Sequence, residues 1–124
     1  MVNHQTIGER ATQLSPQDLT ALLADLHEQR LFRRSQLQQL QLDAVPSAPD
    51  RRRHRPESQR GARVAAAVSA RMILSDVEAA LRRISEGRYG TCQLCRRPVD
   101  RERLMIVPQA RYCARCQQVR RAGQ

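Results

Sequence analysis

Leucine recurs at intervals of three and four residues through the first third of the chain, which is the spacing of one face of an α-helix. The positions are Leu19, Leu22, Leu23, Leu26, Leu37 and Leu40. Arg30 and Arg33 lie on the same face, where the spacing would place apolar residues. Two explanations stay open for them. Their aliphatic stems lie along the face while the charged heads reach water, or they belong to a surface for a partner.

The boundaries of this first helix can be predicted from its flanking residues. Ser15 suits the N-cap, Pro16 the first helical position and Asp18 the positive end of the helix dipole. Residues 1–14 show no clean period and are predicted to be a flexible tail. The helix is expected to end near Leu42, before a loop from Asp43 to Glu57 that holds three prolines and four arginines.

A second helical pattern begins near Ser58 and ends at Gly87, a suitable C-cap residue. Its apolar positions alternate three and four residues apart, as in a coiled-coil seam: Ala67, Ala70, Leu74, Val77, Leu81 and Ile84. Each helix would have about 27 residues and be about 40 Å long. Neither can bury its apolar face alone. We therefore predict a mainly α protein, in which residues 15–86 form an antiparallel helical hairpin with residues 43–57 as its tip loop.

All four cysteines lie in the last third of the chain, as two C-x-x-C pairs. Cys92 and Cys95 are separated from Cys113 and Cys116 by seventeen residues, which is the spacing of a four-thiolate zinc site. A redox pair would need a βαβ setting, which is absent, and disulfides are rare in a cytoplasmic chain. The sequence predicts one structural zinc ion in a small module at residues 87–124. With four protein ligands, the site has no open position for a catalytic water.

The segment between the cysteine pairs is expected to form a short hairpin or ribbon. It would pack Val99, Leu104 and Ile106 against the metal site, and a short helix would follow Cys116.

The charge of the chain is strongly positive. All 22 basic residues are arginines, against 12 acidic residues, and the formal net charge is +10. Such a charge favours polyanionic partners, either nucleic acid or an acidic protein surface. The exclusive use of arginine is also what a GC-rich genome would produce.

Several function classes are disfavoured by what the sequence lacks. No segment approaches the roughly 20 apolar residues of a membrane span, and the first residues lack the apolar region of a secretion signal, so we expect a cytoplasmic protein. The three histidines, His4, His27 and His54, are scattered over a tail, a helix and a loop. No nucleophile–base pair or phosphate-binding glycine loop is visible, so we do not expect an enzyme.

The C-terminal third resembles the zinc finger of the DksA/TraR family of bacterial transcription regulators. The matching positions are Gly87, Tyr89, Gly90, Cys92, Cys95, Pro98, Val99, Arg103, Leu104, Pro108, Ala110, Cys113 and Cys116. The preceding hairpin fits the family's coiled coil, and residues 1–14 are not covered by the resemblance.

This resemblance implies a monomeric regulator that binds RNA polymerase without reading a DNA sequence. The zinc module and terminal helix would dock at the rim of the secondary channel, and the tip of the hairpin would reach toward the catalytic centre. The alarmone ppGpp is often a co-effector in the family.

Two departures from the family pattern bear on this expectation. The family's tip carries Asp-x-x-Asp-x-Ala; here Asp43 and Ala48 fit, Pro46 replaces the second aspartate, and Asp50 stands among arginines. Arg96 also stands where many members have glycine. The positive tip supports an alternative function, that of a basic zinc-ribbon protein that binds nucleic acid nonspecifically.

Overall fold

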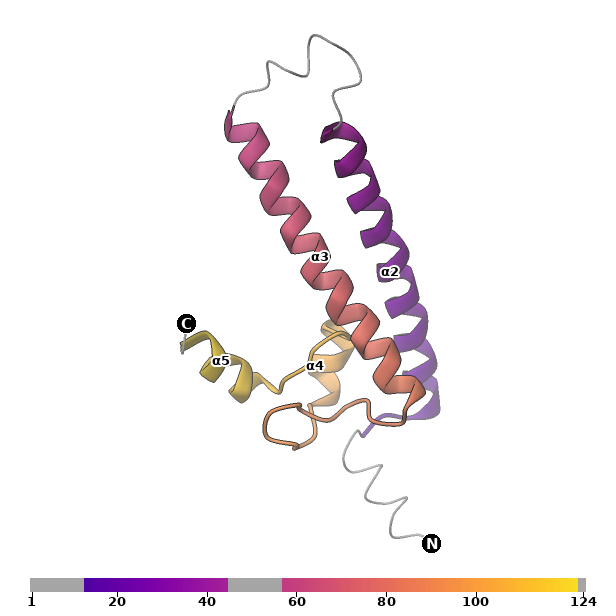
Figure 1. Cartoon of the computed structure of the whole chain (residues 1–124). Coiled ribbons are helices and arrows are strands. Elements are labelled where there is room, and N and C mark those ends of the chain that lie inside the picture. Colours follow the sequence, from indigo (N-terminus) through magenta and orange to yellow (C-terminus); the bar gives the residue numbers. More distant parts are fainter. Residues whose placement is uncertain (1–12, 45–56, 123–124) are drawn as a thin grey trace, which may run out of the picture.

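The computed structural model describes residues 13–44 and 57–122 of the 124-residue chain. Helices α2 (Pro16–Ala44) and α3 (Glu57–Ser85), of 29 residues each, run antiparallel and form a long hairpin (Figure 1). Two short helices, α4 (Arg101–Ile106) and α5 (Ala114–Ala122), lie at its base. The predicted mainly helical fold with a helical hairpin is confirmed. Within the described ranges no helix is both long enough and apolar enough to cross a membrane.

The N-terminus of α2 and the C-terminus of α3 are capped by the residues that the sequence predicted as caps. The Ser15 hydroxyl accepts a hydrogen bond from the Asp18 amide at 3.0 Å, and the Asp18 carboxylate accepts one from the Ser15 amide at 3.1 Å. This reciprocal pair caps α2. At the end of α3, Gly87 adopts a φ of +75°, and the amides of Gly87 and Arg88 bond back to the carbonyls of Ile84 and Arg83. These two bonds make a Schellman cap.

The buried side chains gather at the base of the hairpin. Leu22 and Leu26 of α2 meet Val77 and Ala80 of α3, and all four lie in one cluster with residues of the C-terminal module. The module contributes Tyr89, Cys92, Val99 and Leu104 to that cluster. Beyond Leu26, α2 has no buried residue in its described part. Hairpin and module therefore share a single core.

The half of the hairpin seam that lies farther from the zinc module, the distal seam, has fewer buried side chains than the base. Leu37 and Leu40 of α2 are half-buried, and of the distal residues on α3 only Ala70 is buried within the described range. Arg30 and Arg33 are also half-buried: their Nε atoms are shielded from solvent, while Arg33 Nη1 donates to Gln36 Oε1 at 2.9 Å. This arrangement fits the explanation in which the stems lie along the seam.

The prediction of a hairpin or ribbon between the cysteine pairs is wrong. Residues 101–106 form helix α4, and the β pairing in the described part of the chain is a single bridge between Thr91 and Pro98. Val99 and Leu104 are buried as expected, but Ile106 is 79% exposed. Arginine, glutamate, leucine and methionine are good helix formers, and a six-residue helix turns only one of its faces to the core.

Candidate metal centre

The first cysteine pair lies on a tight turn held by backbone hydrogen bonds. The Cys92 amide donates to the Arg97 carbonyl at 2.8 Å, and the Arg96 amide donates to the Cys92 carbonyl at 3.0 Å. Arg96 has a φ of +65°, in the left-handed region that glycine adopts without strain. Arginine at position 96 therefore allows the turn to form, but its backbone is strained.

The second cysteine pair lies at the start of α5. The Gln117 amide donates to the Cys113 carbonyl at 2.9 Å, and the Cys116 amide lies 3.4 Å from Cys113 Sγ. The Gln93 amide donates to the Arg111 carbonyl at 2.9 Å, which joins the two turns directly. Each turn thus presents its two sulfurs on the side that faces the other turn.

The four sulfur atoms of Cys92, Cys95, Cys113 and Cys116 lie within 4.8 Å of one another. Cys95 Sγ and Cys113 Sγ are 3.9 Å apart. A tetrahedral zinc ion with bonds of about 2.3 Å requires sulfurs about 3.8 Å apart, so the donor set and its size fit zinc. The structure brings together all four cysteines that the sequence proposed as ligands.

Two of the thiols have shifted acidity. Burial raises the pKa of the Cys92 thiol, but hydrogen bonds from the amides of Cys95, Cys113 and Leu94 outweigh it and lower the pKa to about 6. Burial, together with hydrogen bonds to the neighbouring thiols, raises the pKa of Cys116 to about 12. Four sulfurs this close cannot all carry a negative charge without a cation among them, and a bound zinc ion supplies that cation.

Hydrogen bonds to the segment that precedes Cys113 hold the module together and tie it to α3. The buried Tyr89 hydroxyl donates to the Pro108 carbonyl at 2.8 Å. The guanidinium of Arg83, which is 3% exposed, donates to the Ala110 carbonyl at 3.3 Å. Arg111 Nε donates to Asp76 Oδ1 at 2.6 Å. These bonds could not be predicted from the sequence, because nothing in a single sequence pairs one arginine with one distant acceptor.

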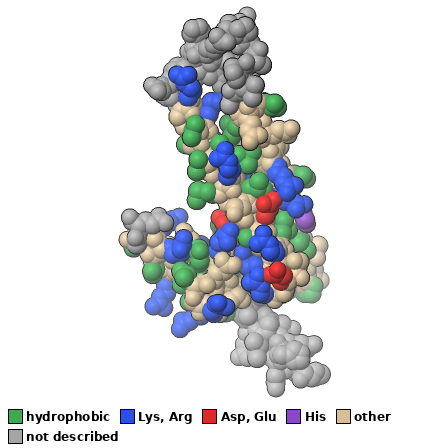
Figure 2. Space-filling model, viewed as in Figure 1, with side chains coloured by type: hydrophobic (Ala, Val, Ile, Leu, Met, Phe, Trp, Pro, Cys, Tyr) green, Lys and Arg blue, Asp and Glu red, His purple; other side chains and the backbone are tan. Residues whose placement is uncertain are grey.

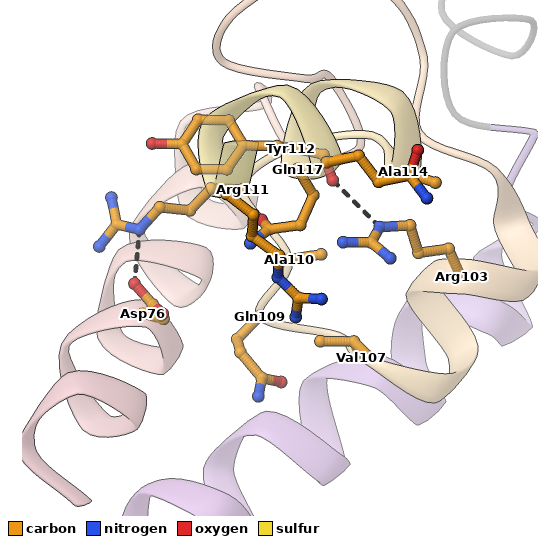
Figure 3. A pocket seen from close by; sticks show the side chains of 11 residues that line it. Asp76, Arg103, Val107, Gln109, Ala110, Arg111, Tyr112, Ala114 and Gln117 are labelled. Atoms are coloured by element: carbon orange, nitrogen blue, oxygen red, sulfur yellow. Dashed lines mark hydrogen bonds and ion pairs between the residues drawn. The ribbon is translucent and has the colours of Figure 1, made fainter. Parts of the chain in front are cut away.

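A pocket of about 410 Å³ opens beside these contacts, between α3, the segment before Cys113 and α5 (Figure 3). Its basic lining residues are Arg103, Arg111 and Arg121, and its acidic one is Asp76. Arg103 also donates to the Tyr112 carbonyl at 3.1 Å. The pocket beside the metal centre therefore has a net positive charge, and it lies where the hairpin and the module meet.

Of the three proposed tip residues, only Asp43 lies in the part of the chain that the structure describes. Asp43 belongs to the last turn of α2, whereas Ala48 and Asp50 lie outside the described residues. Of the histidines, His27 is exposed on α2, and His4 and His54 lie outside the described residues.

Comparison with known proteins gives matches to both parts of the molecule. Residues 87–122 match the family model of the prokaryotic dksA/traR C4-type zinc finger. An uncharacterized protein of Aquifex aeolicus (strain VF5) is 40% identical over 43 residues, which are 35% of this chain and 30% of that protein. The chain thus spans less than a third of that relative's length.

The fold as a whole has a match among solved structures. The transcription factor DksA2 from Pseudomonas aeruginosa is similar with a TM-score of 0.60 and 25% sequence identity, over 85% of this chain and 82% of that one. The C4-type zinc finger and the four clustered cysteines are consistent with one structural zinc ion. Residues 87–122 therefore form a zinc finger of the DksA/TraR type, and the chain as a whole has a fold similar to that of a DksA transcription factor.

Proposed function

We propose that this protein binds RNA polymerase through the secondary channel and modulates initiation without sequence-specific DNA contacts. The observation that carries the proposal is the shared core of hairpin and zinc module. Leu22 and Leu26 of the hairpin pack in the same cluster as Cys92 of the metal centre. A module that docks on a partner can therefore set the direction of a hairpin about 44 Å long.

The four cysteines serve this function structurally. We propose that Cys92, Cys95, Cys113 and Cys116 hold one zinc ion, which fixes the two turns against each other. The protein would act in the cytoplasm as a monomer, and no enzymatic step is assigned to it. Asp43, Ala48 and Asp50 are proposed to lie near the catalytic centre of the polymerase and to act after docking.

The first test is binding of the zinc-loaded protein to core RNA polymerase at physiological salt, in competition with a Gre-type secondary-channel factor. Displacement of the competitor supports the proposal, whereas binding without competition places the protein elsewhere on the polymerase. The titration is repeated with ppGpp, the candidate co-effector, and a change in affinity assigns it a role in the complex.

A second candidate function, nonspecific binding of nucleic acid, is supported by the formal net charge of +10. Salt separates the two functions, because phosphate contacts weaken steeply with ionic strength. Binding to duplex or single-stranded DNA that disappears between 50 and about 200 mM salt, together with no polymerase binding at the higher salt, favours this second function.

A further inference from the structure

The zinc module carries more positive charge than carboxylates in the chain neutralise. Residues 87–122 contain nine arginines and two acidic residues. Arg88, Arg101 and Arg111 each form an ion pair with a carboxylate, and within the described ranges the other six form none. Figure 2 shows basic side chains gathered over the base of the hairpin and the module, with few acidic ones among them.

Three of the six unpaired arginines belong to the turns that hold the metal centre. Arg96 and Arg97 directly follow the first cysteine pair, and Arg115 lies within the second. All three residues are exposed, and among the described residues their guanidinium groups have no acceptor. The four sulfurs of the two turns lie within 4.8 Å of one another, so these arginines flank one compact centre. We call them the turn arginines.

Arg96 occupies its position against the preference of its backbone. Its φ of +65° lies in the left-handed region, and no other non-glycine residue of the described module has a positive φ. A strained backbone of this kind is concentrated at functional sites. Since the exposed guanidinium of Arg96 makes no contact within the described chain that would offset the strain, the side chain points to a partner outside it.

We propose that the turn arginines bind the phosphate backbone of duplex DNA without reading its sequence. A guanidinium presents two parallel donors that match the oxygens of a phosphate, and each contact also releases counterions from the duplex. The inference rests on the second candidate function, nucleic-acid binding, and gives that function a defined surface at the metal centre. It does not depend on the binding of polymerase.

The aromatic side chains of the module favour a duplex over a single strand. Tyr89 is buried, and the guanidinium of Arg120 lies 4.6 Å from the centroid of the Tyr112 ring. The described module therefore offers no freely exposed ring on which an unpaired base could stack. A duplex keeps its bases stacked and presents its phosphates outward, so contacts to phosphate are sufficient to bind it.

The turn arginines have a competing structural role, because four thiolates and one zinc ion carry a net negative charge that nearby guanidinium groups stabilise. Arg96→Gly separates the two roles. Glycine adopts a φ of +65° without strain and removes the guanidinium. If Arg96 serves the DNA, this variant keeps or gains thermal stability and zinc affinity but binds the duplex more weakly. Lower zinc affinity with unchanged duplex binding overturns the inference.

The main test uses the full-length, zinc-loaded protein and a short mixed-sequence DNA duplex, with binding followed by fluorescence anisotropy. The turn variant combines Arg96→Gln, Arg97→Gln and Arg115→Gln. Its control removes three exposed charges from α3 and combines Arg60→Gln, Arg71→Gln and Arg82→Gln. We expect a loss of roughly tenfold or more in the turn variant and no more than about threefold in the control. Between 50 and about 200 mM salt, the slope of log affinity against log salt should also be shallower by about three in the turn variant.

The other outcomes separate the surface from the function on which it rests. Equal losses in the turn variant and its control overturn the surface and leave nucleic-acid binding standing. Tighter binding to a single strand of the same length overturns the assignment to a duplex, and a wild-type protein that does not bind the duplex overturns both inference and second candidate function. Affinity for core RNA polymerase is measured in parallel. A loss there, with duplex binding unchanged, assigns the turn arginines to an acidic protein surface and overturns the inference.

Discussion

The guanidinium of Arg101 donates two hydrogen bonds to the carboxylate of Asp18, at 2.8 and 2.9 Å, across 83 positions of the chain. The pair joins the first turn of α2 to the first residue of α4. It is the counterpart on α2 of the bonds that connect α3 to the segment before Cys113. Each long helix of the hairpin is therefore tied separately to the zinc module.

Asp18→Asn is expected to lower the thermal midpoint by a few degrees, because Arg101 loses a charged acceptor. Hydrogen bonds from Arg101, and then from the Ser15 amide, hold the pKa of the Asp18 carboxyl well below its ordinary value of 3.8. A depressed folded-state pKa stabilises the protein fully above the unfolded-state pKa, and the gain falls as pH drops below it. The difference between wild type and variant, followed by thermal unfolding, should be constant above about pH 5 and shrink below it. A constant difference down to pH 3 would contradict this assignment.

Cys92→Ser is expected to release the zinc ion and loosen α4 and α5 while the hairpin stays helical. The two 29-residue helices hold most of the helical content, and Leu22, Leu26 and Val77 are buried at the base of the hairpin that they form. Metal analysis should fall from one zinc per chain toward none, with a small loss of helical circular dichroism. Leu94→Ser, in the same turn but 51% exposed, is the control. Full retention of zinc by Cys92→Ser would rule out the four-cysteine site.

Zinc binding should release more protons in mildly acidic buffer than at neutral pH. The thiol of Cys92, with a pKa of about 6, is largely a thiolate at pH 7.5 and largely protonated at pH 5. Zinc binds thiolates, so at pH 5 this proton must also leave, and the affinity falls accordingly. Calorimetry in buffers of different ionisation enthalpy should count about one additional proton at pH 5. An unchanged count would show that Cys92 does not titrate in this range.

Arg83→Met is expected to keep or raise stability, whereas Arg83→Ala should lower it by about 2 kcal/mol or more. Arg83 is buried, and its Nε and Nη1 atoms have no hydrogen-bond partner among the described residues. Burial lowers the pKa of the guanidinium, which reflects the cost of holding the charge there. Methionine fills similar space without that cost. Denaturant unfolding of both variants tests this prediction. Equal losses of stability would mean that the hydrogen bond from Arg83 to the Ala110 carbonyl outweighs the cost of burying the charge.

Leu26→Ala is expected to cost about 2–5 kcal/mol, and Leu40→Ala no more than about 1 kcal/mol. Leu26 is fully buried in the shared core, whereas Leu40 is half-buried in the distal seam. Denaturant titrations followed by circular dichroism measure both. Similar losses would mean that the distal seam is packed as tightly as the base.

Local patterns predicted the long helices correctly, and they singled out the four cysteines that the structure brings together. The Ser15 cap, the Gly87 cap and the two C-x-x-C turns each depend on residues a few positions apart, so a single sequence is enough to recognise them. Helix α4 was missed because six residues are too few to show a period. The pairs Asp18–Arg101 and Asp76–Arg111 were missed for another reason: among 22 arginines, no local rule selects one.

The sequence also did not show which apolar side chains of α3 are exposed, since Val64, Val68 and Met72 look like ordinary members of an apolar helix. Only the placement of α3 against α2 shows that these three face away from the seam. The proposed tip residues Ala48 and Asp50 lie outside the described part of the chain, so their role stays a prediction.

The concentration of buried side chains at one end of the hairpin has a consequence for how the protein opens. Local unfolding begins where the least apolar surface is buried, which here is the part of α2 beyond Leu26 and its partner stretch of α3. Amide protons should therefore exchange with solvent in a gradient, fastest toward Ala44 and slowest near Leu22 and Ala80. A hairpin that unfolds locally far from the zinc module, while its base stays folded, would change shape without disturbing the four-cysteine site.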